Sequence, residues 1–70
     1  MEQIKLKAKN LLNETIKSLE SCDKEYLNVT RNDLSNFLEA YFKADLIDSG
    51  LYKYYTDLAT TIFYNRINKI

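Results

Sequence analysis

Few side chains in this sequence are of the kinds that carry out chemistry. The 70 residues include one cysteine, Cys22, and one glycine, Gly50, but no histidine. The most common general base is therefore missing, and Cys22 has no imidazole to activate it as a nucleophile. A single glycine cannot build a phosphate-binding loop, and one cysteine without histidine gives no zinc ligand set. We therefore predict that the protein is not an enzyme and uses no metal or cofactor.

Cys22 lies where the helical pattern breaks, within Ser21-Cys22-Asp23. A free thiol at a helix end could link two chains or react with oxidants. The other interpretation is a small, partly buried residue at a break. A lone thiol also favours a reducing compartment. Because we find neither a signal-peptide pattern nor an apolar run of about 20 residues, we expect a soluble, cytoplasmic protein without a membrane span.

The six tyrosines are the most informative side chains. Tyr52, Tyr54 and Tyr55 cannot all face one core, because consecutive residues of a helix point about 100° apart. Tyr54 is expected on the flank of its helix, and Tyr64 points away from the main apolar stripe. Exposed tyrosine is typical of protein interfaces, but tyrosines also line the edge of small cores with their hydroxyls in water. The candidate partner-binding residues are Tyr41, Asp45, Tyr52, Tyr54 and Tyr64.

The elements that must position these residues are predicted to be helices. The chain has no proline and is rich in leucine, lysine, glutamate and isoleucine, which favour helix. We predict an all-α fold in which residues 1–70 form a single helical domain. Its architecture is a small antiparallel three-helix bundle, with helices at about residues 2–20, 31–48 and 51–68.

Each predicted helix has an apolar stripe at helical spacing. The first stripe contains Ile4, Ala8, Leu11, Leu12, Thr15, Ile16 and Leu19. The second contains Leu34, Phe37, Leu38, Tyr41 and Ala44, with Phe42 at its margin. The third contains Leu51, Tyr52, Tyr55, Leu58, Ala59, Ile62 and Phe63. These stripes predict the core of the bundle.

The second helix has apparent start and stop signals. Thr30 and Asp33 match a capping box, with Thr30 as the N-cap. Gly50 can adopt the left-handed conformation that often ends a helix, so we expect Asp48-Ser49-Gly50 to close it. In the connection before this helix, we expect Tyr26, Leu27 and Val29 to pack against the bundle.

Asp45 lies near the centre of the second apolar stripe, where an unpaired carboxylate would be costly to bury. One interpretation pairs it with a tyrosine hydroxyl or with Arg66 or Lys69. A second places it on a contact surface. A third is that the core stripe ends at Ala44, before Asp45 is reached.

Charge and size limit the function classes. Ten basic residues balance ten acidic ones, so the basic surface that most nucleic-acid binders carry is absent overall. A chain this short buries only about 60% of its unfolded surface, and it has no disulfide or metal to stabilise it. Good helix packing or association with another chain must therefore stabilise the fold.

Two protein families resemble this sequence in the spacing of their apolar and aromatic residues. From Tyr26 to Ile62 it resembles the immunity proteins against pediocin-type (class IIa) bacteriocins, which are helical bundles. The points of likeness are Leu34-Ser35, Tyr41-Phe42, Leu46-Ile47, Leu51, Tyr54-Tyr55 and Leu58. The stretch from Lys53-Tyr54-Tyr55 to Ile62-Phe63 resembles the end of Hha-type nucleoid modulators. The first resemblance implies an immunity function, and the second implies a regulator of nucleoid proteins.

These observations predict a protein that acts by binding rather than by catalysis. We predict a small protein-binding module that acts as an inhibitor, immunity factor or regulator by occupying the surface of a protein partner. A homodimer would bury the surplus aromatic surface. The alternative is a nucleic-acid-associated transcriptional regulator, acting as a dimer or with a DNA-binding partner. In that case the basic edge would consist of Lys5, Lys7, Lys9, Arg66 and Lys69.

Overall fold

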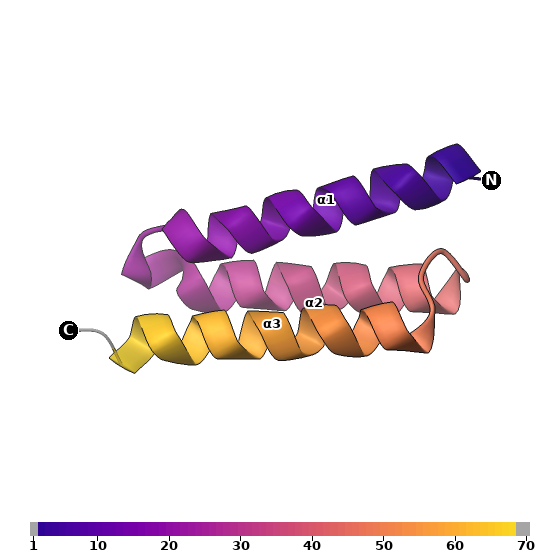
Figure 1. The fold of residues 1–70 in the computed structure, drawn as a ribbon. Coiled ribbons are helices and arrows are strands. Elements are labelled where there is room, and N and C mark those ends of the chain that lie inside the picture. Colours follow the sequence, from indigo (N-terminus) through magenta and orange to yellow (C-terminus); the bar gives the residue numbers. More distant parts are fainter. Residues whose placement is uncertain (1, 69–70) are drawn as a thin grey trace.

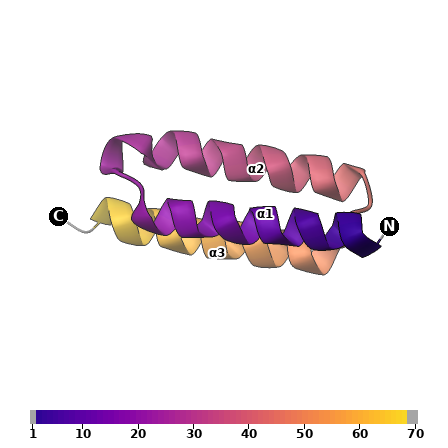
Figure 2. The same ribbon diagram turned by 90° about the horizontal axis from the view of Figure 1, so that it is seen from above.

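The computed structural model describes residues 2–68 and confirms the all-α, three-helix prediction. The elements are α1 (Glu2–Ser21), a short 3-10 helix η1 (Lys24–Tyr26), α2 (Leu27–Lys43) and α3 (Ser49–Asn68). The three helices lie side by side, with α2 antiparallel to both α1 and α3 (Figure 1). As a result, the start of α1 and the end of α3 lie at opposite ends of a bundle that is 43 Å long (Figures 1 and 2).

Most of the core comes from the apolar stripes that the sequence predicts, and Leu27 and Ile47 add to it from outside these stripes. Leu12, Leu19 and Leu34 are fully buried at the centre. The other buried residues are Ala8, Ile16, Leu27, Leu38, Ile47, Tyr55, Ala59 and Phe63. Three members of the predicted stripes are exposed, namely Ile4 and Leu11 of the first and Ala44 of the second, which lies just after the end of α2. Ile4 is exposed because α1 diverges from the other two helices toward its N-terminus (Figure 1).

The predicted start of the second helix is wrong by one turn. The 3-10 helix η1 continues directly into α2, so Thr30 lies inside the helix and caps nothing. Leu27 explains the extra turn, because it is buried in the core and needs a helical backbone to reach it. The neighbouring Tyr26 and Val29 are exposed, which contradicts their expected packing under the connection.

The predicted end of the second helix is also wrong, because α2 stops at Lys43 rather than at residue 48. Asp45 takes the left-handed conformation, with φ of 59°. The Leu46 N–H then donates to the Tyr41 carbonyl at 2.9 Å, and the Asp45 N–H donates to the Phe42 carbonyl at 3.1 Å. These two bonds form a Schellman motif in which an aspartate occupies the position usually held by glycine.

The predicted helix stop at Gly50 is wrong, because residues 48–50 begin α3 instead. Asp48 is the N-cap, and its Oδ1 accepts a hydrogen bond from the Leu51 N–H at 2.8 Å. Gly50 therefore lies in the first turn of α3 and ends no helix. Ile47, which lies between the two caps, is buried. The chain must turn early to place Ile47 in the core, and this explains why α2 is short.

Two polar contacts join α3 to α1. The Tyr55 hydroxyl donates to Asn13 Oδ1 at 2.7 Å. Arg66 Nη1 donates to the Leu19 carbonyl at 3.0 Å and lies 3.5 Å from Cys22 Sγ. Together they fix the parallel register of α1 and α3. Within residues 2–68, no helix has the length and apolar character needed to cross a membrane.

Candidate protein-interaction surface

The structure places the five candidate residues in different surroundings. Tyr41 is half-buried and stacks on Phe37, with ring centroids 6.2 Å apart. Tyr52 is half-buried and its ring centroid lies 5.1 Å from that of Phe42 across the α2–α3 contact. The remaining three candidates, Asp45, Tyr54 and Tyr64, are exposed.

These candidates do not form one surface. Tyr54 and Tyr64 are ten residues apart on α3, so their side chains point about 80° away from each other. Tyr64 adjoins Phe63, which faces α2, with ring centroids 5.7 Å apart. Tyr54 instead contacts Tyr55, which faces α1 through its bond to Asn13. Tyr52 therefore faces α2, whereas Tyr64 and Tyr54 both lie on the outer side of α3, Tyr64 toward α2 and Tyr54 toward α1.

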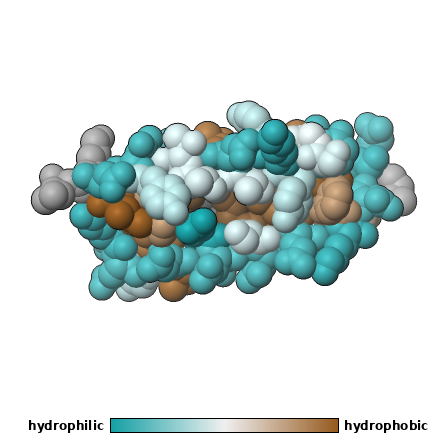
Figure 3. All heavy atoms as spheres, turned by 90° about the horizontal axis from the view of Figure 1, so that it is seen from below, coloured by the Kyte–Doolittle hydropathy of each residue, from teal (hydrophilic) through white to brown (hydrophobic). Residues whose placement is uncertain are grey.

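The surface opposite α1 is formed by α2 and α3, and we call it the α2–α3 face. Figure 3 shows this surface as a band of weakly polar and apolar residues between hydrophilic margins. Phe42 and Tyr52 form an aromatic contact at the end near the α2–α3 connection. We define the face by Arg31, Phe42, Tyr52, Tyr64 and Ile67. Phe42, Tyr64 and Ile67 are exposed by 42%, 52% and 44%.

The solvent side of α3 has little charge. Only Lys53, Asp57 and Arg66 are charged among its 20 residues, whereas α1, of the same length, has seven charged residues. Arg66 is half-buried by its contact with α1, which leaves two exposed charges on α3. Depletion of charge together with exposed tyrosine is the composition expected at the centre of an interface.

Arg31 is a candidate that the sequence analysis missed. Its guanidinium carbon lies 4.5 Å from the centroid of the Phe63 ring, in a cation–π contact. Within residues 2–68, no carboxylate lies within 4.0 Å of this guanidinium. Spacing could have revealed it, because Arg31 follows buried Leu27 by four residues and precedes buried Leu34 by three. A half-buried guanidinium without a carboxylate partner can bind one from another molecule.

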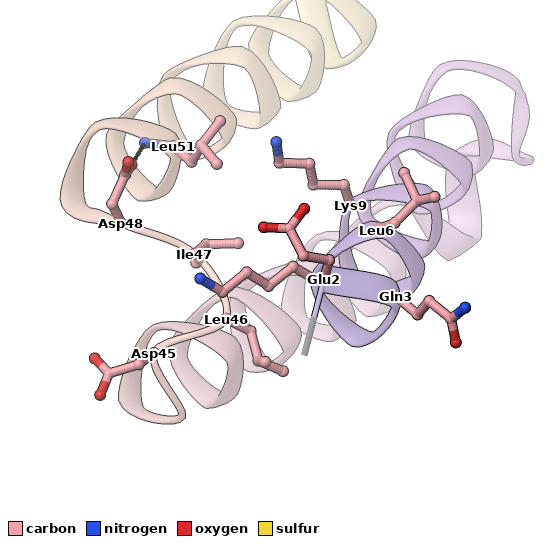
Figure 4. Close-up of a pocket in the computed structure, with 10 residues that line it drawn as sticks. Glu2, Gln3, Leu6, Lys9, Asp45, Leu46, Ile47, Asp48 and Leu51 are labelled. Atoms are coloured by element: carbon pink, nitrogen blue, oxygen red, sulfur yellow. Dashed lines mark hydrogen bonds between the residues drawn. The ribbon is translucent and has the colours of Figure 1, made fainter.

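A second surface feature is a pocket of about 580 Å³ between the first turns of α1 and the α2–α3 connection (Figure 4). Leu6, Ile47 and Leu51 contribute apolar lining. Glu2 and Lys9 reach into it from α1, whereas the carboxylate of Asp45 points away (Figure 4). Acidic and basic side chains both line the pocket, so its charge favours neither an anionic nor a cationic ligand.

The structure decides between several interpretations of single residues. Asp45 is exposed and lies outside the helix, so the interpretation that it is buried beside Arg66 is wrong. Cys22 is half-buried directly after α1, which fits a small residue at a break, whereas its reaction with an oxidant or a second chain stays a prediction. No group of histidine, cysteine or acidic residues within 2–68 is arranged to hold a metal ion.

The expected basic edge does not assemble. Arg66 donates to the Leu19 carbonyl, at the end of the bundle opposite the start of α1, where Lys5, Lys7 and Lys9 lie (Figure 1). Lys69 is outside the described residues. The three lysines of α1 are therefore separated from the basic residue of α3 that was expected beside them.

Comparisons with known proteins do not identify this chain. The resemblances to the pediocin-type immunity proteins and to the Hha-type modulators therefore stay predictions. No protein-family model, no curated protein and no solved structure matches the sequence or its fold.

Proposed function

We propose that this protein is a non-enzymatic, cytoplasmic protein-binding module that occupies the surface of a partner protein and acts as an inhibitor, immunity factor or regulator. The observation that supports the proposal is the α2–α3 face, where aromatic and apolar side chains are exposed beside a helix with little charge. Surfaces of this composition bind proteins through a few large anchors.

The energetics of the face favour binding. Burying an exposed aromatic or aliphatic side chain contributes about 1.5–3 kcal/mol, and Phe42, Tyr64 and Ile67 are each partly available for this. All three lie on helices of a packed bundle, so little backbone entropy is lost when they are covered. Arg31 adds specificity, because a carboxylate on the partner can accept hydrogen bonds from its guanidinium.

The test is a pull-down with the tagged protein from its native host, followed by mass spectrometry and an affinity measurement with the purified partner. We expect Phe42→Ala and Tyr64→Ala each to weaken binding by a factor of ten or more, as for interface anchors. The matched control is Tyr54→Ala, since Tyr54 is as exposed as Tyr64 but lies off the α2–α3 face. Circular dichroism confirms that each variant keeps its helicity.

Two results would contradict the proposal. Equal affinities for the Tyr64→Ala, Tyr54→Ala and wild-type proteins would remove the α2–α3 face as the binding surface. A mobility shift with DNA at low salt that disappears as salt rises would instead support the nucleic-acid alternative, because phosphate contacts release counterions.

A further inference from the structure

We propose that the outer side of α3 binds a second copy of this chain, in an antiparallel pair related by a twofold axis. The inference rests on the proposed function, because it uses Tyr64 of the same surface. Asp57 and Tyr64 are seven residues apart on α3, so both point to the same side of the helix. Both are exposed, and Thr60 and Thr61 lie between them.

This arrangement of residues is self-complementary, as a twofold interface requires. If two α3 helices cross antiparallel between Thr60 and Thr61, Tyr64 of each copy faces Asp57 of the other. The tyrosine hydroxyl is a donor and the carboxylate is an acceptor, so the same bond forms twice. Within residues 2–68, Asp57 has no cationic side chain within 4.0 Å, which leaves its carboxylate available.

The middle of the contact permits close approach. Thr60 and Thr61 are small side chains at the crossing point, and helices pack at 8–10 Å when the residues between them are small. Each threonine also presents a methyl group to the other copy. No charged residue lies between Asp57 and Tyr64 on α3, so nothing there opposes the approach.

The net charge of the chain and the size of the contact both suit association with a second copy. The formal net charge of the chain is zero, so two copies do not repel each other at long range. The second copy covers the outer side of α3, which is about 30 Å long for its 20 residues, so the contact is at the small end of specific interfaces and the dimer should dissociate on dilution.

The first experiment is sedimentation equilibrium over a range of protein concentrations. We expect a concentration-dependent mass that reaches twice the 8.3 kDa of one chain. Tyr64→Phe should raise the dimer dissociation constant about a hundredfold, because two bonds to a charged acceptor are lost and each contributes about a factor of ten. The matched control, Tyr26→Phe, should leave the dissociation constant unchanged, because Tyr26 is about as exposed as Tyr64 but lies on η1 and not on α3.

The second experiment locates the twofold axis by cross-linking, in a Cys22→Ser background that removes the native thiol. Thr61→Cys places a thiol beside the axis, so oxidation should give a covalent dimer. Asn65→Cys is the control, because it lies one turn further along an exposed part of α3 and its two thiols would be too far apart to join.

The outcomes separate this inference from the proposed function. A protein that stays monomeric at all concentrations overturns the second copy, and the proposed function still stands if Tyr64→Ala loses a captured partner. A dimer that is insensitive to Tyr64→Phe, or that cross-links equally through Thr61→Cys and Asn65→Cys, overturns the geometry proposed here. A dimer that weakens with Tyr64→Phe and cross-links only through Thr61→Cys supports it.

Discussion

At the scale of single residues, the turn between α2 and α3 depends on two aspartates. Asp45 takes the left-handed conformation that ends α2, with φ of 59°. Asp48 accepts the Leu51 N–H at 2.8 Å and begins α3. An N-cap side chain satisfies one of the backbone donors that the first turn of a helix leaves without a partner. A single short connection therefore stops one helix and starts the next.

Removing the α3 cap should destabilise the protein. We expect Asp48→Ala to lower the free energy of unfolding by about 1 kcal/mol, the usual effect of losing an N-cap. The control is Thr30→Ala, which should have a clearly smaller effect because Thr30 lies inside α2 and caps nothing. Urea denaturation followed by circular dichroism measures both. A larger loss for Thr30→Ala would mean that α2 begins at the capping box after all.

Tyr55 should make stability depend on pH in the alkaline range. Burial, and to a lesser degree the nearby Tyr54, raises the pKa of Tyr55 above its ordinary value. The folded protein then holds the phenol proton at pH values where the unfolded chain, with a pKa of about 10, has lost it. Its contribution is complete below about pH 10 and is lost as the pH rises through the folded pKa.

The corresponding variant is Tyr55→Phe, with Tyr54→Phe as control. Above pH 10 the unfolding midpoint of the wild type should fall more steeply than that of Tyr55→Phe, and Tyr54→Phe should follow the wild type more closely. Urea titrations at several alkaline pH values provide the slopes. Parallel curves for the wild type and Tyr55→Phe would show that the buried phenol does not control this loss.

At the scale of elements, α1 is anchored at one end and uncovered at the other. Arg66 binds the Leu19 carbonyl in the last turn, where carbonyls lack partners within the helix and the helix dipole is negative. At the other end, Ile4 and Leu6 are exposed, and no residue of α1 before Ala8 is buried. Opening of α1 should therefore begin at its N-terminal turns.

Arg66→Met should release the anchored end while keeping an apolar stem of similar length. We expect hydrogen exchange at the Cys22 N–H, which donates to the Ser18 carbonyl at 2.8 Å, to become about tenfold faster as local opening becomes easier. Exchange at Leu34 in the centre of α2 should change little. Uniform acceleration at both sites would instead indicate that Arg66 supports the whole fold.

Helix existence and core faces were predictable from the sequence, whereas helix ends were not. Buried Leu12, Leu19 and Leu34 recur at a helical period that no strand pattern matches, so their stripes were recognised. Thr30 had the right residue type for an N-cap. The neighbouring residues alone, however, cannot show that Leu27 is buried and that α2 therefore begins one turn earlier. Of the candidate surface, Tyr64 was named from the sequence and stays a prediction, whereas Arg31 was missed because its contact with Phe63 joins residues far apart in the sequence.

At the scale of the whole molecule, stability rests on a small core. A chain of this length has roughly 4–10 kcal/mol of folding free energy, at the usual 0.05–0.15 kcal/mol per residue. Eleven buried residues supply the packing, and within residues 2–68 only Tyr55 among them has a polar group on its side chain. The loss of one central side chain is therefore a large fraction of the total.

Leu34→Ala should remove much of this stability. Leu34 is fully buried, and replacing a buried leucine by alanine costs about 2–5 kcal/mol through lost burial and the cavity left behind. Leu6→Ala is the control, since Leu6 is 59% exposed and should change stability by less than about 0.5 kcal/mol. Thermal and urea unfolding measure the difference. Similar unfolding midpoints for the two variants would contradict the packing described above.

The left-handed conformation of Asp45 also has a genetic consequence. Aspartate and glycine codons differ by one base, and glycine adopts this conformation with less strain. A single-base library selected only for heat resistance should therefore become enriched in glycine at residue 45. A library selected for growth of the native host under conditions that need the protein should retain aspartate if the exposed carboxylate contributes to a contact. Comparing the two enrichments separates the folding role of Asp45 from any binding role.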